Sequence, residues 1–209
     1  MIQFSYHEII KLQNYYISFL MAIILASASS RRAELLLQLG LKFEVKPADI
    51  DESVHAGETD ADYVQRMALE KGEEVRQCCH PEDVVISADT VVCIDQQILG
   101  KPKNEENAIQ MLTSLSGCVH TVLTAVVVSQ SEYLGYSLSK SMVTFRALSQ
   151  DEIKRYWQTG EPQDKAGAYA IQGLGAMFVK NLQGSFSGVM GLPIYETAQL
   201  LKRARVSLL

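Results

Sequence analysis

The stretch of sequence that most constrains the fold is the run Val84 to Ile94, which reads VVISADTVVCI. Its apolar residues follow one another almost without alternation, and this pattern indicates a strand that is buried on both faces. Such strands lie in sheets that helices cover on both sides. The run therefore predicts an α/β fold. One charged residue, Asp89, lies in its middle and breaks the local pattern.

Strand and helix signals alternate along the rest of the chain, without an internal repeat or a low-complexity linker. We expect further strands at 23–26 and 43–45, and an antiparallel pair at 119–128 and 141–148 joined by a loop around Gly135. We expect helices at 31–39, 60–79, 104–115, 149–160 and 193–201. This order favours a mixed sheet flanked by helices.

Local signals support two of these helices in particular. Ser149 and Glu152 form a capping-box sequence at the start of one helix. In the helix expected at 60–79, apolar residues recur at steps of three and four, and they are Val64, Met67, Ala68, Val75 and Cys78. Lys71 lies on this same stripe, where a charge is unexpected.

The length and charge of the chain limit its partners. A chain of 209 residues can form one core with a modest appended lobe, and we interpret residues 21–209 as one domain. The net charge of −5 and the lack of a Lys/Arg block argue against nucleic-acid binding. The four cysteines lack metal-ligand spacing, which favours reduced thiols and a cytoplasmic location.

The first twenty residues need a separate interpretation, because Tyr15 to Ala26 is nearly apolar and Ala26-Ser27-Ala28 resembles a signal-peptidase site. Cleavage there would remove the expected strand at 23–26. The apolar run is also shorter than the roughly 20 residues that span a bilayer. We therefore interpret residues 1–20 as an extension outside the core, with Met21 as a plausible alternative start, and expect no membrane association.

The segment Ser27 to Arg32 reads SASSRR and leads from a strand into a helix. A helix dipole disfavours cations at the N-terminus, yet Arg31 and Arg32 occupy the first turn. A bound anion would resolve the conflict, since free N–H groups, serine hydroxyls and guanidinium groups would converge on it. Alternatively, both arginines point to solvent and the serines only cap the helix. The motif alone does not decide between these.

Asp89 is the second residue that breaks its local pattern. A mid-strand carboxylate loses hydration worth several kcal/mol unless it is paired, hydrogen-bonded or metal-bound. Buried structural aspartates do exist, but this part of a central strand is where α/β sheets bind ligands, so we favour a functional role. Thr90 follows and should face the opposite side of the sheet unless the strand ends or kinks there.

Three further features indicate a functional site only when they are considered as a set. Lys71 by itself is most simply a snorkelling lysine. Lys101 lies in a turn after the Asp89 strand, and the pair Asp51-Glu52 lies in a loop within reach of the first helix. With the glycine-rich segment 164–175, these residues suit a divalent metal, a polyphosphate and a base. Magnesium fits best, because it favours one or two carboxylates plus substrate phosphates. We assign no chemistry to the four histidines, including His120 at a strand edge.

Several motifs resemble the Maf family in order and spacing over residues 21 to about 203: LASASSRRAELL, ALEKGEEV, ISADTVV, LGKPKNEENAIQML, SGCVHTVLTAV, DKAGAYAIQGLG and GLPIYET. The branch acting on dTTP and UTP is most similar. The resemblance implies an elongated α/β fold like that of inosine triphosphate pyrophosphatases, commonly dimeric, with a cleft between two lobes. Ser30 departs from the family, which usually has proline there, and this change should loosen the loop.

The resemblance also implies roles for individual residues. Asp89 corresponds to the proton acceptor, and the specificity positions correspond to Arg31, Thr90 and Gln172. The other site positions correspond to Ser27, Arg32, Glu52, Lys71 and Lys101. Glu52 and Asp89 would hold Mg²⁺ or Mn²⁺.

The implied reaction is hydrolysis of dTTP or UTP to the nucleoside monophosphate and pyrophosphate, as housecleaning of the nucleotide pool. Two alternatives remain. One is a pyrophosphatase for modified purines of the 7-methyl-GTP type, and the other is a non-catalytic nucleotide-binding regulator of cell division.

Overall fold

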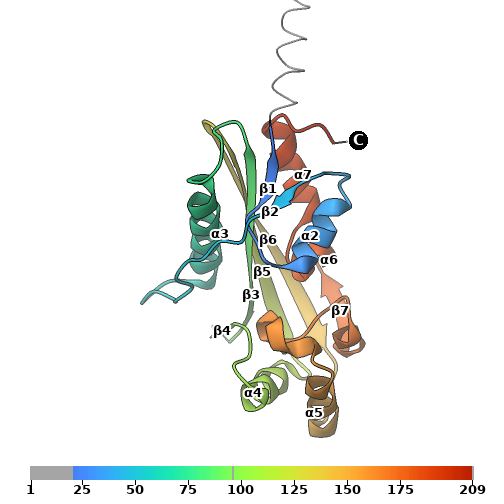
Figure 1. Ribbon diagram of the computed structural model, residues 1–209. Helices are drawn as coiled ribbons and strands as arrows, with labels where there is room; N and C mark the ends of the chain where they lie inside the picture. The colour runs from blue at the N-terminus through green and yellow to red at the C-terminus, as the bar shows by residue number, and fades with distance from the viewer. Residues whose placement is uncertain (1–20, 96, 209) are drawn as a thin grey trace, which may run out of the picture.

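The computed structural model describes residues 21–95 and 97–208, so the extension expected at residues 1–20 lies outside the described residues. The described chain forms one mixed sheet with helices on both faces (Figure 1). Its strands are β1 (Ile23–Leu25), β2 (Glu44–Val45), β3 (Val84–Ile94), β4 (Gln97–Leu99), β5 (Val119–Gln130), β6 (Tyr133–Phe145) and β7 (Val179–Gln183). The α-helices are α2 (Ser30–Leu37), α3 (Asp60–Arg76), α4 (Glu105–Leu115), α5 (Gln150–Gln158), α6 (Phe186–Met190) and α7 (Ile194–Arg203). Three 3₁₀ segments lie between α5 and β7, namely η1 (Glu161–Asp164), η2 (Ala166–Ala168) and η3 (Leu174–Phe178).

The strand order is β2-β1-β3-β5-β6-β7, with β4 paired to β3. β1 runs parallel to both β2 and β3, whereas β3, β5, β6 and β7 pair antiparallel. The predicted mixed α/β sheet is therefore confirmed. β3 spans the predicted residues and is buried along nearly its whole length.

Apolar side chains fill the space on both faces of the sheet. On one face, Met67 and Ala68 of α3 pack against Leu123 of β5. On the other face, Leu36 of α2 and Leu201 of α7 pack against Val126. Figure 1 shows α3 on one side of the sheet and α2, α6 and α7 on the other.

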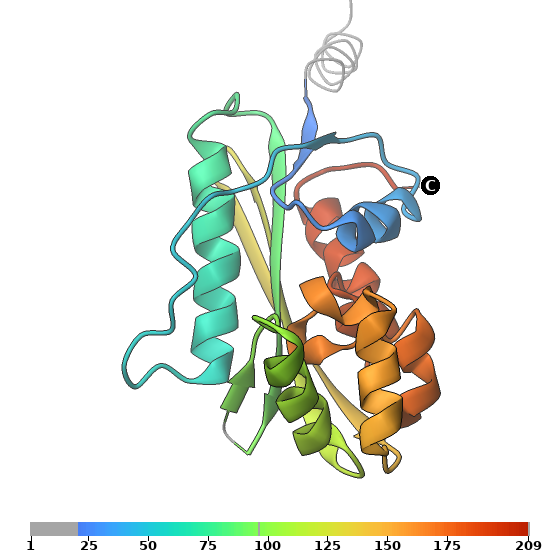
Figure 2. The same ribbon diagram turned by 60° about the horizontal axis from the view of Figure 1, so that its bottom comes forward.

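A further core lies where β3 and β6 end and β5 begins. There, Leu112 of α4 and Ile153 of α5 pack with Phe145 and Phe178. Figure 2 shows α4 and α5 gathered at this end, with the 3₁₀ segments between them and α2. The long central strands thus connect two regions of packing.

The hairpin differs from its prediction. β5 and β6 continue to Gln130 and Tyr133, so the turn consists of Ser131 and Glu132, and Gly135 lies within β6 opposite Val128. Ser131 has a φ of 45° without being glycine or asparagine, so the turn lacks the usual sequence signal. Gly135 is needed for space instead, because a Cβ there would lie 2.2 Å from the hydroxyl oxygen of Tyr133.

Other boundaries also differ. α3 ends at Arg76, and Cys78, which was expected on its apolar stripe, is exposed. β4, β7 and α6 were not predicted, since they have three to five residues each and carry too few apolar positions to show a period. His120 is not at an exposed edge but is 2% exposed. Among the described residues, no helix is long and apolar enough to cross a membrane.

Candidate active site

A break in strand pairing creates a large cavity. On one edge of β3, β1 pairs as far as Ile86 and β4 pairs only from Val92 onward. The edge between them has no strand partner within the described chain. A cavity of about 850 Å³ opens there and reaches both faces of β3, because Asp89 and Thr90 point to opposite faces and both line it. The sequence prediction that these two side chains diverge is confirmed.

The cavity brings together the residues singled out from the sequence. It is lined by Ser27, Arg31, Arg32, Glu52, Lys71, Asp89, Thr90, Lys101 and Gln172. Lys101 and Gln172 are exposed, whereas Ser27, Lys71 and Asp89 are buried. Their roles remain predictions, but residues scattered from position 27 to position 172 do share one cavity.

Lys71 lies between two carboxylates. Its ammonium nitrogen Nζ is 2.7 Å from Oδ1 of Asp89 and 2.6 Å from Oε1 of Glu52. The residue is only 8% exposed, so the snorkelling interpretation of Lys71 is wrong. Burial by itself would raise the pKa of Glu52, but its hydrogen bond to Lys71 and the charges of Lys71, Lys101 and Arg32 lower that pKa overall.

A close approach of α3 to β3 sets this contact. The Ser87 hydroxyl donates to the carbonyl oxygen of Ala68 at 2.6 Å. A Cβ on Gly72 would lie 2.6 Å from Oγ of Ser87, so only glycine allows this spacing. Lys71 is the neighbour of Gly72 on α3 and is buried in the same interface, where it reaches Asp89.

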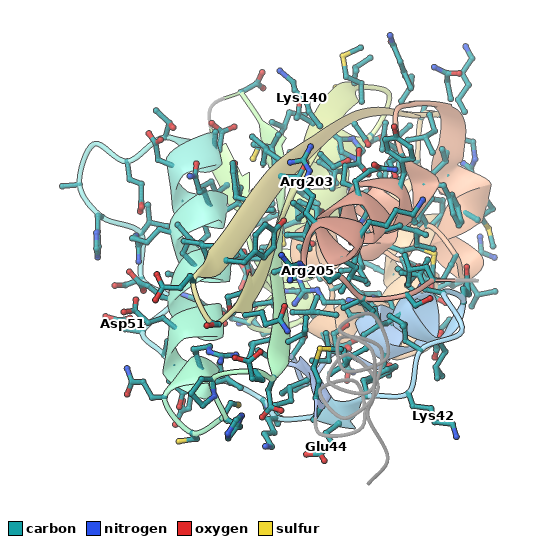
Figure 3. The ribbon with its side chains drawn as sticks, turned by 90° about the horizontal axis from the view of Figure 1, so that it is seen from above. Lys42, Glu44, Asp51, Lys140, Arg203 and Arg205 are labelled. Carbon is teal, nitrogen blue, oxygen red and sulfur yellow. The ribbon has the colours of Figure 1, made fainter. Side chains whose placement is uncertain are left out.

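A side chain of α3 holds the loop that carries Glu52. The Tyr63 hydroxyl donates to the carbonyl oxygen of Glu52 at 2.9 Å. The neighbouring Asp51 is exposed at the edge of the molecule beside α3 (Figure 3). There it accepts hydrogen bonds from the backbone N–H and hydroxyl of Ser53. Of the acidic pair noticed in the sequence, only Glu52 therefore lines the cavity.

The two arginines of α2 have different surroundings. Arg32 donates from Nε to the carbonyl oxygen of Gly191 at 2.8 Å, from Nη1 to Oγ of Ser27 at 3.1 Å and from Nη2 to Oγ1 of Thr90 at 3.3 Å. Burial lowers the pKa of Arg32. Arg31 has no comparable set of bonds among the described contacts and lies 3.7 Å from a carboxylate oxygen of Asp164.

The solvent-facing alternative for this motif is therefore wrong. Ser29 is the N-cap of α2 but its side chain makes no capping hydrogen bond, so the first-turn amides are left for another partner. Ser30 is the first residue of the helix rather than part of a loop, and this is a position that proline also suits. The expected loosening of a loop at Ser30 has no basis in this geometry.

The glycine-rich segment approaches the protein's own side chains. Gly167 has a φ of 68°, and a Cβ there would lie 3.0 Å from Val92. Tyr169 is fixed by His120, whose Nε2 lies 2.9 Å from the tyrosine hydroxyl oxygen. Burial lowers the pKa of His120 to about 4. The glycines thus serve packing within the protein, while Gln172 faces the cavity.

Sequence reasoning missed several residues that line the cavity. They are Tyr63, Lys103, Asp164 and Lys165. Lys165 forms an ion pair with Asp164, which also faces Arg31. Burial alone would raise the pKa of Asp164, but Lys165 and Arg31 lower it. The letters Asp-Lys at the start of the glycine-rich segment were the available signal.

The metal ligands expected from the sequence are two carboxylates, those of Glu52 and Asp89. No group of three or more His, Cys, Asp or Glu residues in the described part of the chain is arranged to hold a metal ion. The carboxylates of Glu52 and Asp89 both contact one ammonium nitrogen, so they lie close to each other. A pair of carboxylates suits magnesium better than a metal that needs a full set of protein ligands.

A mixed α/β sheet with a cavity beside β3, lined by paired carboxylates and several cationic side chains, defines a protein suited to a small and strongly anionic ligand. The chain belongs to the family of Maf-like proteins, whose model matches residues 22–204. A protein of Pseudoalteromonas atlantica named dTTP/UTP pyrophosphatase is 50% identical over 184 residues, covering 87% of this chain and 96% of that protein. A protein of Methylococcus capsulatus with the same name is 51% identical over 180 residues, covering 86% and 89%.

Among solved structures, a HAM1 protein from Coxiella burnetii superposes with a TM-score of 0.49 and 15% sequence identity. The superposition covers 88% of this chain and all of that chain.

Proposed function

We propose that this chain hydrolyses nucleoside triphosphates, dTTP and UTP above all, to the nucleoside monophosphate and pyrophosphate. The observation that carries the proposal is that Asp89, Glu52 and several lysines and arginines line one cavity. The names of relatives about half identical to this chain support the choice of substrate.

Cations at the cavity would bind the triphosphate. Arg31 and the uncapped first turn of α2 offer charge and N–H donors on one side. Lys101 is exposed in the loop after β4 and can reach a ligand without breaking a contact in the core. Arg32 is already held by three hydrogen bonds, so its part is to fix Ser27 and Thr90 and to add positive charge. These groups would position the substrate and stabilise its charge.

Asp89 would act on the attacking water. Its carboxylate lines the cavity and is held in place by Lys71, while the opposite face of β3 presents Thr90. In the reaction we propose, water attacks the α-phosphorus, Asp89 accepts or directs the proton of that water, and pyrophosphate leaves.

The residues present also fit a divalent cation. Glu52 and Asp89 lie close together because both contact the ammonium of Lys71, and this proximity of two carboxylates supports the proposal that they hold one cation. Mg²⁺ or Mn²⁺ held by these two carboxylates would supply charge neutralisation on the phosphate oxygens. The contribution of the chain itself is to keep the two carboxylates together and to orient them.

Gln172 would read the base. Its amide offers a donor and an acceptor, which match the edge of uracil and thymine, and it lines the cavity from the segment after η2. The hydroxyl of Thr90 is engaged with Arg32 and with Oγ1 of Thr124 at 2.9 Å. We therefore assign base selection to Gln172 and a supporting part to Arg31 and Thr90.

Two other functions are less well supported. A pyrophosphatase for modified purines would resemble S-P-W-R-R at the first motif and S-E-G at the later one, which Ser30-Arg31-Arg32 and Ile171-Gln172-Gly173 do not match. A non-catalytic regulator of cell division would have no need of a buried aspartate beside a second carboxylate.

The remaining expectations concern organisation. We propose one domain over residues 21–209, with two lobes that share β3, β5 and β6 and flank the cavity. A homodimer in the cytoplasm, without nucleic-acid or membrane partners, stays a prediction from the family resemblance and the sequence.

The deciding experiment incubates the purified full chain with a panel of nucleotides and Mg²⁺ or Mn²⁺ in ¹⁸O-labelled water. Release of monophosphate and pyrophosphate, with the label in the monophosphate, is the expected result. Label in pyrophosphate would place the attack at the β-phosphorus, and release of diphosphate and phosphate would exclude a pyrophosphatase. Binding of UTP without turnover would favour the regulator, and faster turnover of 7-methyl-GTP would favour the purine alternative.

A further inference from the structure

The segment that carries Gln172 is held in shape by two side chains outside the cavity. Ala170, two residues before Gln172, donates its N–H to the hydroxyl oxygen of Tyr156 at 3.1 Å. Leu174, two residues after it, donates its N–H to Oε2 of Glu161 at 2.9 Å. Gly175 donates its N–H to Oε1 of the same carboxylate at 3.0 Å. Backbone groups on both sides of Gln172 are therefore bound to one small polar cluster.

The two side chains are also bound to each other. The Tyr156 hydroxyl donates to Oε1 of Glu161 at 2.6 Å. Tyr156 is 4% exposed, and its ring packs edge-on against Phe178 with centroids 4.9 Å apart. Its helix, α5, begins with a complete capping box. The cluster is therefore attached to a well-packed part of the molecule, and charge-assisted bonds to a carboxylate are among the stronger hydrogen bonds.

Gly173 makes room for the carboxylate. A Cβ at this position would lie 2.2 Å from Oε2 of Glu161. The φ of Gly173 is −111°, outside the left-handed region that favours glycine, so the constraint that we identify is the space occupied by Glu161. The glycine next to Gln172 is thus explained by the approach of Glu161.

We propose that Glu161 is a positioning residue for base selection. Glu161 binds the backbone after Gln172 directly, and it is linked to the backbone before Gln172 through Tyr156. These bonds set where the Gln172 amide lies in the cavity. The inference rests on the proposed function, in which Gln172 reads the base. Neither Glu161 nor Gly173 lines the cavity, and the residues proposed for the phosphates lie on other elements. Loss of the cluster should therefore act on the choice of base more than on the phosphates.

The test compares kcat/KM for UTP, CTP and GTP in the full-length protein and in Glu161→Gln, Tyr156→Phe and Gly173→Ala. We expect the preference for UTP over CTP to fall at least about 10-fold in Glu161→Gln and Gly173→Ala, since small misplacements of positioning groups are costly. Gly173→Ala should fold, because the atoms that its Cβ would displace belong to the carboxylate end of the Glu161 side chain and not to the backbone. The double variant Glu161→Gln/Gly173→Ala should lose no more of the preference for UTP over CTP than the worse of its two single variants, since both substitutions act through one carboxylate.

Asp83→Asn is the matched control. Asp83 is another buried carboxylate that accepts backbone N–H groups, from Ala22 and His80, and it lies outside both the cavity lining and the Gln172 segment. This variant should lower the melting temperature and leave base preference unchanged.

The outcomes separate the two proposals. If the unmodified protein shows no base preference, the proposed function fails and the role of Glu161 fails with it. If the unmodified protein prefers UTP while Glu161→Gln and Gly173→Ala lower kcat/KM equally for all three nucleotides, only the positioning role is overturned. Should Glu161→Gln not fold, Gly173→Ala and Tyr156→Phe decide in the same way.

Discussion

Asp89 and Lys71 form a pair in which each charge satisfies the other. Their side chains are 13% and 11% exposed, and the contact between them is 2.7 Å. Had Asp89 been unpaired, removal of its charge would have raised stability, because it would have lifted a desolvation penalty. Breaking a buried pair has the opposite effect, because it leaves the second charge with fewer partners. Glu52 remains as one partner of Lys71 and limits the loss.

We therefore predict that Asp89→Asn keeps the fold, lowers the melting temperature modestly and lowers kcat by at least about 10²-fold, the scale of losing a general base. Turnover of UTP and thermal unfolding followed by circular dichroism would measure both. Asp83→Asn is the matched control, because Asp83 is also buried but binds the backbone N–H groups of Ala22 and His80. Near-normal turnover in Asp89→Asn would exclude the proposed role.

Gln172→Glu tests the reading of the base. The substitution removes the amide donors and adds negative charge near the triphosphate, so kcat/KM for dTTP and UTP should fall by about 10²-fold or more. The fold should be unaffected, because Gln172 is exposed. Gln150→Glu on α5 is the control. If the Gln172 variant keeps the rate and the pyrimidine preference of the original protein, Gln172 does not select the base.

At the scale of elements, the packing of α3 on β3 controls the site. Gly72→Ala would place a Cβ 2.6 Å from Oγ of Ser87 and push the helix and Lys71 outward. We predict a loss of about 1–3 kcal/mol in the free energy of unfolding, as for other overpacked cores, together with lower turnover. Urea unfolding and steady-state kinetics would measure these.

The double variant Gly72→Ala/Ser87→Ala provides the control. Removal of Oγ leaves Cβ of residue 87 as the nearest atom, at 3.4 Å, which is an ordinary contact. The double variant should therefore regain most of the turnover, although the hydrogen bond from Ser87 to Ala68 is lost. No recovery would mean that the spacing of α3 and β3 does not set the position of Lys71.

For the whole molecule, His120 predicts a pH dependence of stability. Its pKa falls from about 6.5 in the unfolded chain to about 4 in the fold, because burial disfavours the charged ring. As the pH falls, the unfolded chain therefore binds this proton before the folded chain does. The contribution of the neutral His120 ring to the free energy of unfolding is complete above pH 6.5 and is lost as the pH falls toward 4. The full shift corresponds to a loss on the order of 3 kcal/mol.

Urea unfolding at several pH values between 7 and 4 would measure this loss. In His120→Gln the free energy of unfolding should change less steeply with pH across this range. In His80→Gln, at an exposed position, it should change as steeply as in the unmodified protein. Equal slopes in the unmodified protein and His120→Gln would contradict the assignment.

The first residues that the structure describes give a second prediction for the whole molecule. Ala22 already donates its N–H to Oδ1 of Asp83 at 3.0 Å, and its carbonyl oxygen accepts from Val84. Deletion of residues 1–20 should leave melting temperature and turnover nearly unchanged, because the core predicted from the sequence starts at residue 23 and the described contacts of Met21 and Ala22 are kept. Mass spectrometry of the native protein is a separate check, since a chain that begins after Ala28 would lack β1 and would establish the signal-peptide interpretation.

The sequence by itself determined the elements whose signal is local. The continuous apolar run fixed β3 to the residue, and the capping box at Ser149 fixed the start of α5. Burial and capping act over a few residues, so periodicity and cap chemistry report them directly. Charges in apolar surroundings marked Asp89 and Lys71, and local context also marked Arg31, Arg32, Glu52 and Lys101. The family resemblance supplied the role of Gln172.

Only the tertiary structure decided which of these residues meet. Lys71 reaches Asp89 across 18 positions, and Arg32 bonds to Gly191 across 159. The cavity exists because β1 stops pairing at Ile86 and β4 begins to pair only at Val92 on one edge of β3, and no local pattern predicted β4 or the extent of either pairing. Contacts between distant segments depend on how whole elements pack, which no local pattern of residue types encodes.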